Sequence, residues 1–211
     1  MKLTNTISIM KKFLLLAIVL TSINIISQFS FESWNTLNIK GKINPKLKLT
    51  IEGEQRYNFT YNYIRYFHTD LGLVYEINDQ LSLGSYYREL YEIKNEARVI
   101  EIRPHIDFFY EFTEKWKVRI RNEYQIKELD NNIYRFRIRP TYKYKINKAL
   151  SLFIQTEGFF IGTNLVRNRF NPGVAIKLDK IVIEPGYMLE SNNEESWNHI
   201  YIFWINTKIK F

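Results

Sequence analysis

The sequence predicts an all-β protein, an antiparallel, up-and-down transmembrane β-barrel of ten to twelve strands. Three observations lead to this fold class. The same short turn recurs at an almost constant spacing, the segments between the turns alternate apolar and polar residues, and those segments are longer than ordinary strands. Regular alternating strands separated by polar turns are typical of barrels that cross a membrane.

The recurring turn consists of an apolar residue, a short polar stretch and then Leu-x-Leu. It occurs as INPKLKL from Ile43, INDQLSL from Ile77 and INKALSL from Ile146. FTEKWKV from Phe112 is a degenerate copy, and LDKIVI from Leu178 is one residue shorter. The starting points are 34, 35, 34 and 32 residues apart, and one further step of 33 residues reaches the last residue. Such a period indicates a repeated structural unit, although helical repeats also have periods near 34.

The residue pattern inside each unit excludes the helical alternative. In 99–112, VIEIRPHIDFFYEF, apolar residues occupy every second position and charged residues most of the others. The same alternation runs through 47–57, 116–128, 133–146 and 200–211. A period of two with many Tyr, Phe, Ile and Val residues indicates strands with two different faces, whereas a helix needs apolar residues three and four positions apart.

The length and number of the strands complete the fold prediction. Each unit holds two strands of roughly 12–14 residues, and a tilted strand needs about 9–11 residues to cross a bilayer. The linkers KNEA, LDNN, TNLVRN and SNNEESWNH are expected to form the longer loops at the end opposite the short turns. Five units give ten strands, and the alternating segment 37–43 is an eleventh candidate. Bacterial single-chain barrels normally have an even number, so the prediction spans ten to twelve.

The first 27 residues have the features of a secretory signal peptide. Lys2, Lys11 and Lys12 precede an apolar run from Phe13 to Leu20, and a cleavage site is expected after Ser27. We therefore expect residues 1–27 to be removed and residues 28–211 to form a single outer-membrane barrel domain. The 211 residues contain no cysteine, which excludes disulfides, thiolate metal sites and a lipid-bearing cysteine.

Four prolines lie on the apolar face of the predicted strands. They are Pro104, Pro140, Pro172 and Pro185. Proline cannot donate to the hydrogen-bond ladder of a sheet and is usually found at edges or bulges. We expect each of these prolines to form a bulge that helps the sheet to curve.

Charged residues on the other face of three strands form the candidate site. If this face points inward, these side chains meet across a narrow lumen, because small barrels are filled by side chains. One interpretation is a salt-bridged core, since unpaired charges there are costly. The other is an anion-selective pore or a site for an acidic ligand, since arginine binds phosphate and carboxylate well. The predicted ladder comprises Glu101, Arg103, Asp107, Arg119, Arg121, Glu123, Arg135, Arg137 and Arg139.

The chain ends in a strand that closes with Phe211. A terminal strand ending in phenylalanine resembles the assembly signal of bacterial outer-membrane barrels. The resemblance implies that the barrel-assembly machinery and outer-membrane lipid are partners, and that the short turns lie on the periplasmic side. The net charge of +8 does not indicate a nucleic-acid partner, because the basic residues alternate along strands with acidic residues nearby.

Much of the sequence resembles the DUF2490 family of predicted outer-membrane barrels, common in Bacteroidetes and related bacteria. The segments that carry this resemblance are RFRIRPTYKYKINKALSL, LSLFIQTEGFF, NRFNPGVAIKL, IEPGYMLES and WNHIYIFWINTKIKF. These are strand patterns and not catalytic signatures. The resemblance implies a fold and a location in the outer membrane of a Gram-negative bacterium, and it implies no activity.

Three functional hypotheses follow from these features. The first is a non-enzymatic outer-membrane barrel with a charge-filled lumen, serving an envelope role or acting as a narrow channel. The second is an enzyme that modifies lipid or lipopolysaccharide, for which Ser196, His199 and Glu195 are a conceivable loop trio without a recognised spacing. The third is a secreted barrel that binds a hydrophobic ligand. The sequence predicts no catalytic residue, no metal site and no cofactor.

Overall fold

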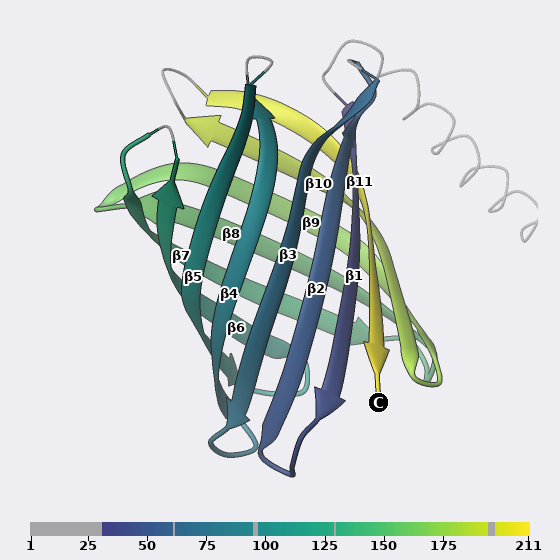
Figure 1. Cartoon of the computed structure of the whole chain (residues 1–211). Coiled ribbons are helices and arrows are strands. Elements are labelled where there is room, and N and C mark those ends of the chain that lie inside the picture. Colours follow the sequence, from purple (N-terminus) through teal and green to yellow (C-terminus); the bar gives the residue numbers. More distant parts are fainter. Residues whose placement is uncertain (1–30, 61, 95–96, 129, 194–196) are drawn as a thin grey trace, which may run out of the picture.

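Eleven strands form one closed barrel in the computed structural model (Figure 1). The predicted signal peptide lies outside the described residues. Within the described part of the chain, no helix is long and apolar enough to cross a membrane. The described residues are 31–60, 62–94, 97–128, 130–193 and 197–211. The strands are β1 (Phe31–Lys42), β2 (Leu47–Asn58), β3 (Tyr63–Glu76), β4 (Leu81–Lys94), β5 (Ala97–Glu111), β6 (Trp116–Lys127), β7 (Ile133–Lys145), β8 (Leu150–Ile161), β9 (Asn164–Leu178), β10 (Ile181–Asn193) and β11 (Trp197–Lys210).

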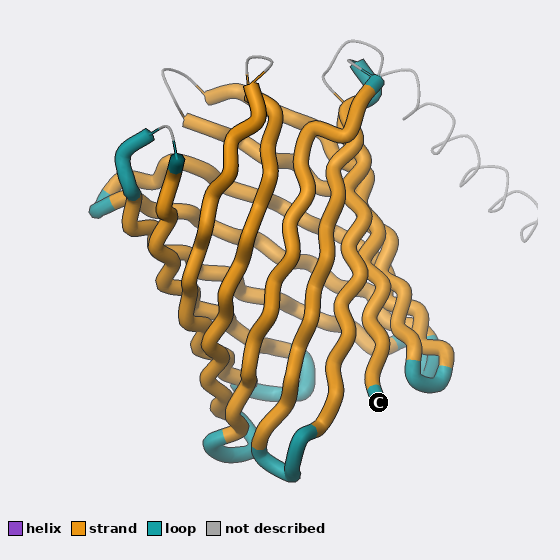
Figure 2. The backbone as a smooth tube through the Cα atoms, in the orientation of Figure 1, coloured by secondary structure: helices purple, strands orange, loops and turns teal. Residues whose placement is uncertain are grey.

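The barrel closes through a parallel pair formed by its first and last strands. Consecutive strands are antiparallel neighbours around the barrel, and β1 pairs with β11 from Phe31↔Tyr201 to Lys40↔Lys210. Figure 2 shows the last strand, which leads to the C-terminus, beside the first one, and the arrowheads of β1 and β11 in Figure 1 point toward the same end. An odd number of up-and-down strands requires this arrangement, because the first and last strands then point the same way. The predicted number of strands is confirmed, and the candidate segment 37–43 belongs largely to β1.

A single side chain organises four of the five copies of the recurring turn. The Oδ1 atom of Asn78 accepts hydrogen bonds from the backbone N–H groups two and three residues later, at 2.9 and 2.8 Å. Asn44 and Asn147 make the same two bonds in their turns. In the degenerate copy the hydroxyl of Thr113 replaces the amide, at 3.2 and 3.1 Å. Because these bonds are local, the four-residue motif folds as a turn at each of these places. The shorter copy forms a two-residue turn in which Asp179 has a positive φ of 49°.

The loops at the opposite end are shorter than the sequence predicts. β9 begins at Asn164, so TNLVRN is mostly strand. β10 continues to Asn193 and β11 begins at Trp197, so SNNEESWNH is also mostly strand. Residues whose composition is typical of loops therefore extend the strands of the barrel wall. The prediction that the loops at this end are longer than the short turns is wrong.

The prolines interrupt the hydrogen-bond ladders without forming bulges, which corrects the prediction. Ladder partners are missing at Pro104 between β5 and β6, at Pro140 between β7 and β8, and at Pro172 and Pro185 between β9 and β10. The register is nevertheless the same on both sides of each gap. Each proline keeps its partner on the other neighbouring strand. A residue directs its N–H toward one neighbour only, so a missing N–H weakens one ladder and leaves the other intact.

The barrel is apolar outside and polar inside. Among the described residues, 22 polar or charged side chains are buried against nine hydrophobic ones, while 34 large hydrophobic side chains are exposed. This distribution is the inverse of a protein that folds around an apolar core. The polar face of each strand therefore lies inside the barrel and the apolar face outside, as the alternation predicts. Six of the buried hydrophobic side chains form a small cluster, which consists of Trp34, Phe153, Ala175, Met188, Ile202 and Trp204.

Tyr86 lies over two glycines inside the barrel. A Cβ atom at Gly72 would be 2.1 Å from Cδ1 of Tyr86, and one at Gly84 would be 2.5 Å from Cε2. The ring of Tyr86 also stacks on His105, with centroids 4.7 Å apart and an interplanar angle of 8°. The two glycines therefore leave the space that this ring fills.

Replacing Gly72 by valine is expected to lower the free energy of unfolding by roughly 1–3 kcal/mol, because the new side chain overlaps the Tyr86 ring. Urea unfolding followed by tryptophan fluorescence measures the change. Gly53→Val is the matched control, because the nearest atom to a Cβ there is 3.9 Å away. Equal destabilisation by both variants would contradict the role of the ring.

Candidate functional site

All nine residues of the predicted charge ladder point into the barrel. They come from the neighbouring strands β5, β6 and β7. Seven are buried, and Arg103 and Arg139 are half-buried. Eight line a central cavity of about 780 Å³, and Glu123 is fully buried. The structure thus brings together Glu101, Arg103, Asp107, Arg119, Arg121, Glu123, Arg135, Arg137 and Arg139.

Cross-strand register pairs four members of this ladder as opposite charges. Arg121 lies opposite Asp107, and its Nε and Nη2 atoms donate to the two carboxylate oxygens at 2.6 and 2.7 Å. Arg135 lies opposite Glu123, and its Nη2 donates to Oε1 at 2.5 Å. Hydrogen bonds between ionised groups are roughly twice as strong as neutral ones. The two pairs therefore fix neighbouring strands to one another from the inside.

Glu157 on β8 completes the ladder and was not singled out from the sequence. Arg119 and Arg137 both donate to its Oε1 atom, the latter from Nη2 at 3.0 Å. Nη1 of Arg137 also donates to Glu123 at 3.2 Å, so Arg137 bridges two carboxylates. Glu157 is 2% exposed. Its signal in the sequence is the alternation of LSLFIQTEGFF, which places this acidic residue on the inner face.

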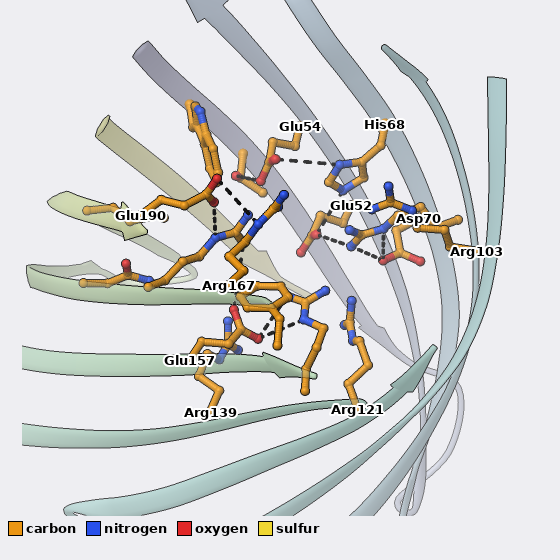
Figure 3. Close-up of a pocket in the computed structure, with 18 of the residues that line it drawn as sticks. Glu52, Glu54, His68, Asp70, Arg103, Arg121, Arg139, Glu157, Arg167 and Glu190 are labelled. Carbon is orange, nitrogen blue, oxygen red and sulfur yellow. Dashed lines mark hydrogen bonds and ion pairs between the residues drawn. The ribbon is translucent and has the colours of Figure 1, made fainter. Parts of the chain in front are cut away.

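A second ionic group lies on β2, β3 and β4, and its residues are not among those predicted from the sequence. Arg88 donates to Oδ2 of Asp70 from Nε and Nη2, at 3.1 and 2.7 Å. Nε2 of His68 is 3.3 Å from Oε1 of Glu52. Figure 3 shows this group on one wall of the pocket, with Glu157 on another. No local pattern in the sequence indicates this group, because it depends on the register of β2 against β3, which sets Glu52 opposite Asp70.

Three of these side chains have the spacing of metal ligands. Ligand atoms of Glu52, His68 and Asp70 lie within 4.8 Å of one another. However, Nη2 of Arg88 is 2.7 Å from Asp70 and 3.4 Å from Glu52, and it supplies the positive charge that balances the carboxylates. The arrangement is therefore an ion-paired cluster.

An aromatic ring contributes to the same interior. The buried side chain of Phe159 has four guanidinium groups near its ring, at 4.5–5.6 Å from the ring centroid, and they belong to Arg135, Arg137, Arg167 and Arg169. Arginine interacts favourably with the face of an aromatic ring, most strongly where water is excluded. The ring of Phe159 therefore stabilises four guanidinium groups that repel one another electrostatically.

On the outer surface, near the end opposite the short turns, Ser191 and His199 face each other across β10 and β11. Oγ of Ser191 is 2.9 Å from Nδ1 of His199. Of the loop trio considered from the sequence, Glu195 and Ser196 lie outside the described residues. The structure thus brings His199 to a different serine.

The lining of the cavity carries a net positive charge. It includes fifteen lysines and arginines against nine aspartates and glutamates. Paired guanidinium and carboxylate groups connect neighbouring strands of the barrel wall. The excess of cations sets the sign of the electrostatic potential in the lumen. The arrangement is suited to filling the lumen and to selecting charged solutes by sign.

These features define a class of protein, a closed β-barrel with an apolar exterior and an ion-paired interior. A model of the DUF2490 family, described as a protein of unknown function, matches residues 31–200, from the start of β1 into β11. The chain belongs to the DUF2490 family, which confirms the resemblance seen in its strands. No curated protein matches the chain.

Proposed function

We propose that this protein is an outer-membrane β-barrel of a Gram-negative bacterium whose lumen is filled by ion pairs. Its role is structural in the envelope or that of a narrow channel. The observation that carries the proposal is the exterior, where 34 large hydrophobic side chains are exposed. Soluble monomeric proteins rarely expose continuous apolar patches larger than a few hundred Å². A lipid environment removes this surface from water.

The distribution of exposed aromatic residues supports the same location. Bacterial outer-membrane barrels have aromatic girdles at both membrane interfaces. Strands of 12–15 residues are long enough to cross a bilayer when tilted. Exposed aromatic residues near the short turns include Tyr75, Tyr110, Phe112, Trp116, Tyr144 and Phe211, and those near the other end include Phe59, Tyr91, Tyr124, Tyr134, Trp197 and Tyr201.

Cell fractionation combined with gel mobility tests this proposal. We expect the protein in the outer-membrane fraction, and we expect unboiled samples to migrate differently from boiled ones on a denaturing gel. Folded barrels resist detergent because every backbone group is paired within the closed sheet. A soluble periplasmic protein without a mobility shift would exclude the membrane location.

The C-terminal residue supports a role for the barrel-assembly machinery. Phe211 lies at the end of the barrel that carries the short turns (Figure 1). Its backbone N–H donates to Lys40 at 3.1 Å, and its ring lies 2.7 Å from a Cβ atom built at Gly41. Phe211→Ala keeps the backbone bonds and is expected to reduce the folded protein in the outer membrane while refolding in detergent is retained. Unchanged assembly in cells would exclude this role.

Conductance decides between the two roles of the lumen. The ion pairs of Arg121 with Asp107 and of Arg137 with Glu157 join neighbouring strands along the wall of the lumen, and their buried side chains occupy space there, which favours a closed barrel. In planar bilayers a closed barrel gives no steady current, and this result would assign the structural role. A small current with a preference for anions would assign the channel role, because the lining carries an excess of cations.

The contact between Ser191 and His199 favours a second candidate function, that of a lipid-modifying enzyme. An imidazole at 2.9 Å from a hydroxyl is within reach to act as a general base. Both side chains lie on the outer face, which is the face toward lipid in the proposed location. Lipid profiles of cells that carry Ser191→Ala test it, and unchanged acyl chains would exclude the enzyme.

A further inference from the structure

The charges of the lumen are not balanced evenly along its length. In the middle of the barrel, Asp107 holds Arg121, Glu157 holds Arg137 and Arg119, and Glu190 holds Arg169. Toward the short turns the interior contains lysines instead. Of the acidic residues near that end, Glu76 is engaged by Lys48 and Glu184 by Lys208. Glu111 lies opposite Lys117 in the register of β5 and β6, in an exposed position at the rim. Cations therefore remain in excess at this end.

Four of these cations converge from opposite walls. Lys40 and Lys208 are on β1 and β11, and Lys117 and Arg139 are on β6 and β7, halfway around the barrel. All four line the central cavity. Lys40 is within electrostatic reach of Lys208, Glu52 and Arg139, and Lys117 is within reach of Lys208, Arg139, Lys40 and Glu111, so cations outnumber acidic groups around both lysines. They face one shared space.

Three of the four make no ion pair with another described residue. Lys208 pairs with Glu184 at 2.7 Å, but the side chains of Lys40, Lys117 and Arg139 have no hydrogen bond or ion pair in the described part of the chain. The three are half-buried. Unpaired charges away from bulk water are costly, and like charges at close range add to that cost. A counter-ion at this place would remove both costs.

Unsatisfied donors lie beside the same cations. Nε of Arg139 is buried without an acceptor, and so is the hydroxyl of Thr141, two residues further along β7 on the same face. Thr141 is the cross-strand partner of Lys117. An oxygen-rich anion accepts hydrogen bonds from a guanidinium, a hydroxyl and two ammonium groups at once.

We propose that Lys40, Lys117, Arg139 and Lys208 form an anion-binding site inside the short-turn end of the barrel, with Thr141 as an additional donor. Its ligand is a phosphate-type oxyanion, either inorganic phosphate or the phosphoryl group of a small soluble molecule. Arginine with lysine suits the several oxygens of phosphate better than it suits a monatomic ion. The inference uses only the lumen and goes beyond the proposed location and role.

Calorimetric titration of the purified, folded barrel with inorganic phosphate at constant ionic strength tests the site. We expect saturable binding that chloride and acetate do not reproduce. Lys117→Gln combined with Arg139→Gln is expected to weaken binding about tenfold or more, because charge-assisted hydrogen bonds are lost. The double variant also removes a repulsion, so it is expected to fold, and its gel mobility shift verifies this.

The matched control removes two charges from the same end outside the lumen, through Lys115→Gln and Lys148→Gln in exposed turns. Unchanged phosphate binding in this control supports the site. No binding by the unaltered barrel, equal binding of chloride, or equal weakening in the control would overturn it. Loss of phosphate binding when a glycerophospholipid is added to the micelles would assign the phosphoryl group to a lipid and not to a soluble molecule. None of these outcomes depends on where the barrel resides in the cell.

Discussion

Replacing Glu157 by glutamine is expected to lower the free energy of unfolding by about 3–5 kcal/mol, because removal of one partner leaves buried charges uncompensated. Glu157 is 2% exposed and accepts hydrogen bonds from Arg119 and Arg137. The glutamine keeps the shape of the side chain and removes only its charge. Urea unfolding of the refolded barrel, followed by the gel mobility shift, measures the effect.

The matched control for this substitution is Glu114→Gln, in an exposed turn outside the barrel wall. It makes the same chemical change where the solvent screens charge, and its effect is expected within about 0.5 kcal/mol. A Glu157→Gln barrel as stable as the control would mean that water enters the lumen and solvates the arginines. That result would favour an open channel over a lumen closed by ion pairs.

Replacing Leu71 by arginine is expected to destabilise the barrel in lipid vesicles by roughly 2–4 kcal/mol, the cost of a cation near the middle of a bilayer. Leu71 is in the central part of β3 and its side chain is 54% exposed on the outer face. In water the same change would be nearly neutral. Unfolding in vesicles therefore reports directly on contact with lipid.

Ile77→Arg provides the reference for that measurement. Ile77 is also exposed and adjoins β3, but it lies in a short turn at the end of the barrel. At the interface the cost is expected to fall to about 0–1 kcal/mol. Equal effects of the two substitutions would argue against a bilayer around the middle of the barrel, whatever their size.

The strands and their two faces could be predicted from the sequence because alternation is a local property of the chain. The turns could be predicted for the same reason, since Asn78 and its counterparts make their bonds within four residues. The effect of the prolines on the sheet could not be predicted, because the consequence of a missing N–H group depends on which neighbouring strand that group would have faced. Loop lengths failed because polar residues such as Asn192 and Asn198 also pair within the extended wall.

The candidate site was predictable where its members occupy consecutive strands. Asp107, Arg121 and Arg135 belong to β5, β6 and β7, so alternation alone places them together. The partners that complete the network come from β8 and from β2 to β4. Their contacts depend on register and on closure of the barrel, which no local pattern specifies. Glu157 and the pair of Arg88 with Asp70 were therefore found only in the structure.

The parallel seam between β1 and β11 places the two ends of the folded domain at opposite rims. Phe31 starts β1 at the rim opposite the short turns, and Phe211 ends the chain at the other rim. A barrel with an even number of strands has both ends at one rim, where a few residues can join them. Here a linker would have to run the whole height of the wall, at about 3.3 Å per residue when extended. Many barrels tolerate circular permutation through a short linker. In this barrel the odd number of strands alone prevents it, because a short linker cannot join the two rims.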